Sequence, residues 1–271
     1  MRGSELIHHT IVGHHGEWLV FIHGLTSDQS DRQPQVDALS NNYRCLLIDS
    51  RGHGKSSQMP PPYNIQTDAQ DLARLLDHLG IVNAVLIGHS RGVRVGSATA
   101  TLAPHTTGGL VFVDGSQQGR GNPDAERKRV FDMIEAAESV DVFLNEMFTA
   151  MFPIGTPAVR QQAITDRAAS MPNARYLELM GDMVRWDASS MEDTFAGLNV
   201  PVGVIQGTTI NEKRERRALQ AGEMTPFMEM IRENIADAIF ESVPDVGHFT
   251  NLDAPEPVIR MIQTIAGKLP S

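Results

Sequence analysis

The segment that decides the fold reads Ala84-Val85-Leu86-Ile87-Gly88-His89-Ser90-Arg91-Gly92. It begins as an apolar run, and a helical pattern starts just after Ser90 and continues to about Leu102. On a sharp turn from a strand to a helix, glycines two positions before and after a serine let the two elements approach closely. The serine hydroxyl is then held above the sheet edge, where the helix N-terminus adds positive potential and free N–H groups. The segment therefore predicts an exposed, nucleophilic serine at position 90.

Five further apolar runs have the length and composition of buried strands. They are Trp18–Ile22, Tyr43–Ile48, Leu110–Val113, Val200–Ile205 and Ile239–Val243. Continuous apolar strands are typical of a sheet that is covered on both faces, and therefore of a parallel sheet. Helical patterns lie between the strands, among them Gln66–Leu79 and Pro255–Lys268. The alternation predicts the α/β class, with a mostly parallel central sheet flanked by helices.

The alternation is interrupted between residues 116 and 196. This part has no convincing strand, but it has amphipathic helical stretches at Arg127–Ala137, Val140–Met151 and Pro157–Ser170. We predict that residues 116–196 form a helical cap, inserted into one α/β core that consists of residues 1–115 and 197–271. A second excursion, Thr208–Asp237, separates the last two predicted strands.

Ten of the 13 methionines lie in these two excursions. They are Met133, Met147, Met151, Met171, Met180, Met183, Met191, Met224, Met228 and Met230. Methionine adapts to irregular apolar surfaces. The more common interpretation is that these side chains fill the space between cap helices. The alternative is that some of them line an apolar substrate pocket.

Composition and charge exclude several classes of protein. The 271 residues include 33 acidic and 23 basic side chains, and the formal net charge is −10. An acidic surface repels phosphate backbones, which argues against a nucleic-acid partner. The hydrophobic fraction of 41% is enough for a buried core and excludes wholesale disorder. A single cysteine, Cys45, cannot form an internal disulfide.

No apolar run approaches the ~20 residues that span a bilayer. The first residues also lack the apolar core of a signal peptide. We therefore expect a cytoplasmic protein with no membrane partner. The oligomeric state is left open between a monomer and a homo-oligomer, and the expected partner is a small-molecule substrate.

A serine needs a base and an acid to become an effective nucleophile. The base is expected on a loop after the last strand, and among ten histidines only His248 has this placement. The acid has two candidate positions. The turn after the fifth predicted strand is the usual one, but its only carboxylate is Glu212. Asp114 directly follows the fourth strand, and we favour it over Glu212 and over a role as a simple turn cap.

The developing oxyanion needs two backbone N–H donors. One is expected from Arg91, the residue after the nucleophile, and the other from Leu25, in the loop after the first predicted strand. The candidate side chains for substrate contact are His23, His89, Trp186 and Phe249. For His23 the alternative is bracing of its loop, and for Trp186 it is packing of the cap on the core.

Other charged and histidine clusters have plainer interpretations. Arg91 and Arg94 lie one helical turn apart and could meet a substrate carboxylate, but such residues more often form ion pairs within the scaffold. Residues 214–217, which read Arg-Glu-Arg-Arg, are expected to form a solvated face. Adjacent histidines at 8–9 and 14–15 would point to opposite faces of a strand, and Gly54-Lys55-Ser56 lacks the earlier glycine of a phosphate loop. We therefore expect no metal and no cofactor.

These residues, together with Asp49–Ser56, resemble the α/β-hydrolase superfamily over nearly the whole chain, with the cap excepted. The resemblance implies a mostly parallel sheet, a helical cap and a Ser–His–acid triad, and it leaves the substrate undefined. An acid after the fourth strand departs from the commoner layout. It resembles a subset that includes amide-cleaving hydrolases and cofactor-free dioxygenases of hydroxyquinolones. Those dioxygenases typically carry histidine after the serine, where this chain has Arg91.

The favoured hypothesis is a serine hydrolase that cleaves an ester, lactone or amide of a small to medium, largely apolar substrate. One alternative is a cofactor-independent dioxygenase of a hydroxylated N-heteroaromatic compound, in which His248 and Asp114 deprotonate the substrate. The other is a non-enzymatic receptor for a small ligand. A shared fold cannot separate these hypotheses, because one fold hosts many functions.

Overall fold

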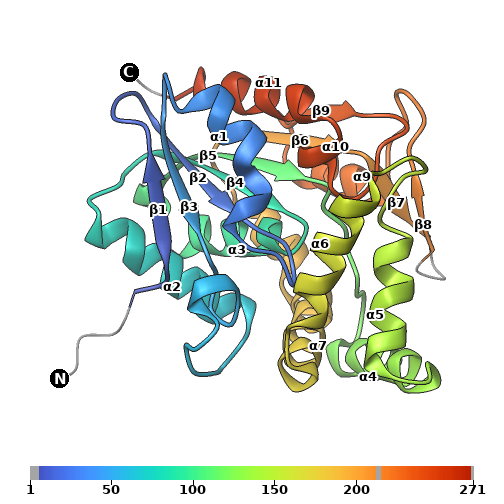
Figure 1. Cartoon of the computed structure of the whole chain (residues 1–271). Coiled ribbons are helices and arrows are strands. Elements are labelled where there is room, and N and C mark those ends of the chain that lie inside the picture. The colour runs from blue at the N-terminus through green and yellow to red at the C-terminus, as the bar shows by residue number, and fades with distance from the viewer. Residues whose placement is uncertain (1–5, 212–214, 270–271) are drawn as a thin grey trace.

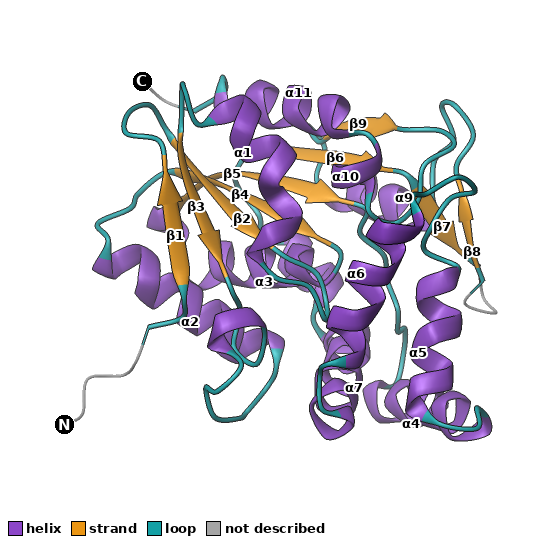
Figure 2. Ribbon diagram, in the orientation of Figure 1, coloured by secondary structure: helices purple, strands orange, loops and turns teal. Residues whose placement is uncertain are grey.

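A single large sheet organises the chain (Figures 1 and 2). The structure is a computed structural model that describes residues 6–211 and 215–269. Seven strands lie in the order β1-β3-β2-β4-β5-β6-β9. Their bounds are β1 His9–Val12, β2 Trp18–Ile22, β3 Arg44–Ile48, β4 Ala84–His89, β5 Thr107–Val113, β6 Val202–Gln206 and β9 Ile239–Ser242. All neighbours pair in parallel except β1, which is antiparallel to β3. The predicted mostly parallel α/β sheet is confirmed.

Each of the six predicted apolar runs forms a strand of this sheet. The seventh strand, β1, was not predicted. Thr10 and Ile11 at its centre are exposed, because an edge strand that lies half in solvent does not need a continuous apolar run.

Helices cover both faces of the sheet. Figure 1 shows α1 (Gln33–Leu39) and α11 (Pro255–Ala266) on one side, and α2 (Ile65–His78) and α3 (Arg91–Leu102) on the other. The second face also carries α8 (Met191–Ala196) and α9 (Pro226–Asn234), and each face has its own buried apolar cluster. Short helical turns complete the core: η1 (Gln29–Arg32), η2 (Gly54–Ser56), η3 (Pro104–Thr106) and α10 (Thr250–Asp253).

Local sequence explains where these helices begin and end, and α2 is an example. The Asn64 side chain accepts a hydrogen bond from the Thr67 N–H at 2.7 Å and caps the helix. Leu72 and Leu76, one turn apart, are both fully buried, and each contributes about 1.5–3 kcal/mol by leaving water. Gly80, with φ of +66°, ends the pattern just after the helix.

Four helices form a layer beyond the carboxyl ends of the central strands (Figure 2). They are α4 (Pro123–Ala136), α5 (Val140–Thr149), α6 (Ala158–Ala169) and α7 (Asn173–Ser189), and we refer to them as the cap. The cap has its own apolar cluster, which it completes with Tyr63 and Phe249 from the core. The sequence interpretation placed all of residues 116–196 in the cap, but Met191 and Phe195 on α8 pack in the core cluster instead.

The second excursion contains a small antiparallel hairpin, β7 (Thr208–Ile210) and β8 (Arg216–Ala218). Figure 1 shows this hairpin beside the end of α5. Across the residues that the structure describes, no helix combines the length and the apolar character needed to cross a bilayer.

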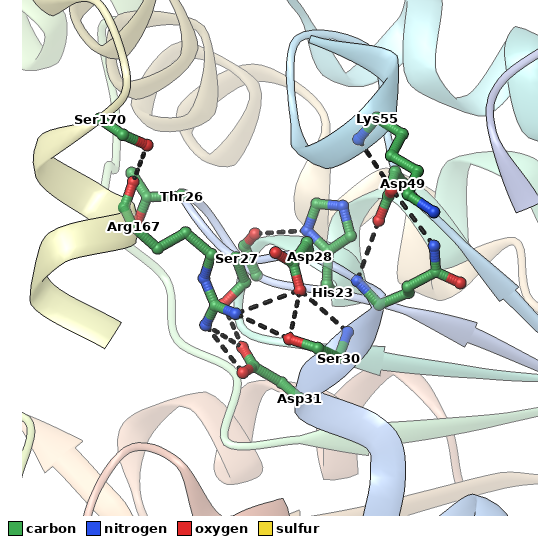
Figure 3. Close-up of polar contacts among 12 residues, drawn as sticks. His23, Thr26, Ser27, Asp28, Ser30, Asp31, Asp49, Lys55, Arg167 and Ser170 are labelled. Carbon is green, nitrogen blue, oxygen red and sulfur yellow. Dashed lines mark hydrogen bonds and ion pairs between the residues drawn. The ribbon is translucent and has the colours of Figure 1, made fainter. Parts of the chain in front are cut away.

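An ion-pair cluster fastens the cap to the core (Figure 3). Arg167 on α6 donates from Nη2 to both carboxylate oxygens of Asp31 at 2.7 Å, and from Nη1 to Asp28 at 3.1 Å and to Ser30 at 3.0 Å. Ser27 donates a further hydrogen bond to Asp31 at 2.7 Å. One guanidinium thus bridges two carboxylates of the loop that precedes α1.

Replacing Arg167 by alanine is expected to lower the free energy of unfolding by about 1–3 kcal/mol, because the buried Asp31 carboxylate loses its charged partner. The comparison variant is Lys128→Ala, which removes an exposed pair with Asp132 on the cap surface and should change stability by less than about 1 kcal/mol. Urea unfolding of both variants measures the difference. Equal losses would show that the Arg167 cluster adds nothing beyond an ordinary surface pair.

Candidate active site

Ser90 lies on the turn between β4 and α3 with φ of 53° and ψ of −114°. This is the left-handed region, which costs about 1–3 kcal/mol for a residue other than glycine. Two close approaches hold the turn in place. A Cβ at Gly88 would collide with the backbone of Gly92, and a Cβ at Gly92 would collide with the carbonyl oxygen of Ile22. The two glycines are therefore required by packing, as the sequence pattern predicts.

The structure brings Ser90, His248 and Asp114 together. The distance from His248 Nε2 to Ser90 Oγ is 2.9 Å, and the distance from His248 Nδ1 to Asp114 Oδ2 is 2.5 Å. Ser90 follows β4, Asp114 follows the neighbouring β5, and His248 lies on the loop after β9, which β6 separates from β5. Because a carboxylate only accepts hydrogen bonds, Nδ1 carries the imidazole proton and Nε2 presents its lone pair to the serine hydroxyl.

Asp114 is fully buried and its carboxylate is extensively hydrogen-bonded. Oδ1 accepts from the N–H groups of Gly207 and Thr208 at 2.8 and 2.7 Å, and Oδ2 accepts from the Thr208 hydroxyl at 2.6 Å. The turn after β6, where the commoner layout has its acid, here supplies donors to the acid of the neighbouring strand. Glu212, the alternative acid, lies outside the described residues.

Arg216 on β8 is a further partner of Asp114, and the sequence interpretation missed it. Its Nη1 lies 3.3 Å from Asp114 Oδ2, and it also donates to the Thr208 hydroxyl. Residues 214–217 were predicted to form a solvated face, yet the Arg216 side chain is only 7% exposed. Alternation along β8 turns Arg216 inward, while Arg217 pairs with Glu223 at the surface. The strand that contains Arg216 has three residues, which is too short for an alternation of inward and outward side chains to be visible in the sequence.

The environment of His248 keeps its imidazole neutral. The pKa of His248 is lowered to about 4: burial is the largest cause, the nearby Arg216 charge acts in the same direction, and Asp114 opposes both. At neutral pH the ring is therefore unprotonated at Nε2, which is the form that accepts a proton from a hydroxyl.

The structure places the residues of both predicted oxyanion donors close to Ser90 in the chain or in the cavity. Leu25 follows the end of β2 and lines the space above the serine. Arg91 is the first residue of α3, and its side chain points away to form a buried ion pair with Asp68 at 2.6 Å. Arg94 is bound by both oxygens of Asp187 at 2.6 Å. Both arginines thus form ion pairs within the scaffold, as the more common interpretation predicts.

A cavity of about 400 Å³ opens above Ser90, and we refer to it as the main cavity. Its core side includes Leu25, His89 and Phe249. The cap contributes mostly apolar side chains: Met133, Phe143, Met147, Phe148, Met151, Met180 and Met183. Five of the excursion methionines therefore line a pocket, whereas others, such as Met228, pack in the core.

Two of the four predicted substrate contacts do not line the main cavity. His23 donates from Nδ1 to the Gly24 carbonyl at 2.7 Å and accepts at Nε2 from the Ser50 N–H at 2.9 Å, so both ring nitrogens brace the loop after β2. Trp186 packs against the core cluster beneath the cap. The observed positions therefore agree with the alternatives given above, in which His23 braces its loop and Trp186 packs the cap on the core.

His89 and Phe249 do line the main cavity. His89 Nε2 bonds the backbone carbonyl of His248 at 2.8 Å and so fixes the loop that carries the base. Burial, followed by the neighbouring His248, lowers the pKa of His89 well below its ordinary value, so this ring is also neutral. Among the residues described, no three histidine, cysteine or carboxylate side chains converge in the way that a metal ion requires.

Comparison with known proteins gives a consistent picture. The sequence model described as "Alpha/beta hydrolase family" matches residues 19–261. A "2-(acetamidomethylene)succinate hydrolase" of Mesorhizobium japonicum is 24% identical over 255 residues, which cover 91% of this chain and 87% of that protein. A "Putative carbamate hydrolase RutD" of Caulobacter segnis is 35% identical over 111 residues, but this match spans only 40% of either chain.

Solved structures share the fold at low sequence identity. An esterase from Exiguobacterium antarcticum superposes with a TM-score of 0.78 at 19% identity, covering 97% of this chain and 96% of that chain. An enol-lactonase from Burkholderia xenovorans gives a TM-score of 0.75 at 24% identity, covering 97% and 96%. At these identities the similarity concerns the fold alone.

Proposed function

The chain belongs to the alpha/beta hydrolase family, and from this premise we propose that it is a serine hydrolase that cleaves an ester, lactone or amide bond. The observation that carries the proposal is the chain of two short contacts from Ser90 through His248 to Asp114, beside a cavity that Ser90 and His248 both line. The apolar cap side chains favour a small to medium, largely apolar substrate.

The geometry suits nucleophilic acyl transfer. Ser90 Oγ attacks the carbonyl carbon as its proton passes to His248 Nε2, and the carbonyl oxygen becomes an oxyanion bound by the N–H groups of Leu25 and Arg91. The tetrahedral intermediate collapses when the bond to the leaving group breaks and His248 returns the proton to that group. A water molecule, deprotonated by His248, then attacks the acyl-enzyme and releases the acid and free Ser90.

Asp114 has two tasks in this mechanism. It holds His248 in the tautomer with the proton on Nδ1, and its negative charge stabilises the imidazolium that forms during each proton transfer. The N–H groups of Gly207 and Thr208 hold the Asp114 carboxylate in a fixed orientation. The carboxylate is therefore already aligned with His248 before the proton transfer begins.

A fluorophosphonate probe combined with a chromogenic ester tests the proposal. We expect one label per chain, located on Ser90 by mass spectrometry, and loss of p-nitrophenyl ester hydrolysis in parallel with labelling. Oxygen consumption with a hydroxylated N-heteroaromatic compound, in the absence of any ester or amide hydrolysis, would contradict the proposal.

The pH dependence of kcat/KM follows from the lowered pKa of His248. Catalysis needs the neutral imidazole, so kcat/KM should be level at neutral pH and fall about tenfold per pH unit below the pKa of about 4. Ester hydrolysis from pH 3.5 to 8, with folding checked by fluorescence at each pH, measures this limb. A limb near the ordinary histidine value of 6.5 would show that burial and Arg216 do not act on His248 as described.

A further inference from the structure

A second hollow adjoins the main cavity, and we refer to it as the side chamber. It has a volume of about 520 Å³ and lies between the chain segment that enters the cap and the β7–β8 hairpin. The two spaces share four lining residues: Ser116, Gln118, Ile210 and Arg216. Arg216 therefore stands at the boundary between the space above Ser90 and the side chamber.

The side chamber is positively charged although the whole chain carries a net charge of −10. Its charged lining residues are Arg120, Arg129, Arg216 and Glu126. Arg129 pairs with Glu126 at 2.5 Å, so these two charges offset each other. Arg120 donates from Nε to the neutral Gln117 side chain at 2.5 Å, and no described carboxylate lies within ion-pair distance of it. Arg216 pairs with Asp114, which does not line the side chamber, so the lining offers an anion the charge of Arg120, unpaired among the described residues, and the remaining donors of Arg216.

Part of the Arg216 guanidinium is available to donate hydrogen bonds to a ligand. Its Nη1 is occupied by Asp114 and Thr208, but Nε and Nη2 have no acceptor within the described part of the chain. Arg94, the other arginine of the main cavity, differs in this respect because both its Nε and its Nη2 bond Asp187. The carboxylates Glu146 and Glu215 line the main cavity and not the side chamber, which directs an anion toward the side chamber.

We propose that Arg216, supported by Arg120, binds a carboxylate of the substrate, so that the enzyme prefers esters or amides that combine an apolar part with a carboxylate. The apolar part then occupies the methionine-lined main cavity and the carboxylate occupies the side chamber. A guanidinium presents a fork of N–H groups that matches a carboxylate. This inference rests on the proposed serine-hydrolase activity and names the substrate class of the same site.

Matched substrate pairs test the proposal. The first pair is p-nitrophenyl hemiglutarate and its methyl ester, with the carboxylate on the acyl side. The second is 4-acetoxybenzoic acid and its methyl ester, with the carboxylate on the leaving group. We expect kcat/KM to favour the carboxylate in at least one pair, and Arg216→Gln to reduce that preference about tenfold to a hundredfold, the effect of losing a charge-assisted hydrogen bond. Arg216→Lys should restore part of it.

The preference is the ratio of kcat/KM for the two substrates of a pair, so a general loss of activity cancels. This is necessary because Arg216 also contacts Asp114, and its replacement can lower kcat/KM for every substrate. Arg217→Gln is the matched control: it removes the neighbouring arginine of β8, which pairs with Glu223 at the surface, and should leave the preference unchanged. Arg120→Gln changes an exposed side chain and should weaken the preference without affecting folding, so the proposal stays testable if Arg216 variants do not fold.

Binding without turnover gives an independent measurement. Isothermal titration of Ser90→Ala with p-nitrophenyl hemiglutarate and with 4-acetoxybenzoic acid, with and without Arg216→Gln, should show weaker binding in the double variant by about tenfold or more for the preferred compound. Ester hydrolysis with no preference in either pair would overturn this inference and leave the hydrolase proposal standing. Absence of any ester or amide hydrolysis would instead overturn the hydrolase proposal, and this inference with it.

Discussion

Replacing Ser90 by alanine should reduce kcat for ester hydrolysis by a factor of about 10⁴–10⁶, because the variant loses the hydroxyl that lies 2.9 Å from His248 Nε2. Residual hydrolysis above the rate in water is expected, since the oxyanion donors and the cavity remain. The measurement is steady-state hydrolysis of a p-nitrophenyl ester by the purified variant, with an active-site titration of the parent protein to fix its concentration.

A buried serine on α3, the helix that follows Ser90, provides the control. Ser97 donates to the Val93 carbonyl at 2.8 Å within α3 and does not line the main cavity. Ser97→Ala should therefore keep kcat within a few-fold of the parent, since it makes the same chemical change without touching the proposed catalytic groups. Activity of Ser90→Ala close to that of Ser97→Ala would reject an acyl-enzyme mechanism.

The second large effect is expected for Asp114→Asn, with a fall in kcat of about 10⁴. The physical reason lies in the hydrogen bonds around position 114. The N–H groups of Gly207 and Thr208 both point at Oδ1, so the asparagine carbonyl must stay there. Its amide N–H₂ then faces His248 Nδ1 as a donor, which forces the imidazole proton onto Nε2. His248 would present an N–H, and not a lone pair, to the Ser90 hydroxyl.

Glu212→Gln is the matched control, because it neutralises the other candidate acid in the same way. We expect no more than a few-fold change in kcat for this variant. The pH profile adds a second measurement: Asp114→Asn should show a slow recovery of activity at high pH, where hydroxide replaces the lost base. Loss of activity in Glu212→Gln, together with retention in Asp114→Asn, would reverse the assignment.

Local sequence signals were sufficient to predict that Ser90, His248 and Asp114 meet. Each follows an apolar strand directly or within one short loop, and parallel strands deliver their carboxyl ends to one edge of the sheet. The prediction needed only strand positions and the order of the elements. The catalytic roles of the three residues remain predictions that the two variants above test.

Features that depend on distant packing could not be predicted in this way. Arg216 lies in a charged segment that resembles any solvated surface, and only the pairing of β7 with β8 turns its side chain toward Asp114. Met191 and Phe195 have the same apolar character as the cap residues, and whether they pack on the cap or the sheet is decided by the path of the chain after α7.

The Thr208 hydroxyl lies 2.6 Å from Asp114 Oδ2, so the segment after β6 reaches the carboxylate at the end of the neighbouring β5. A carboxylate placed at position 208 would stand beside the one at 114, on the side of the sheet from which His248 receives its acid partner. Position 208 therefore offers protein engineers a site at the end of β6 where an aspartate, combined with a neutral residue at 114, would show whether the acid can be supplied from the next strand.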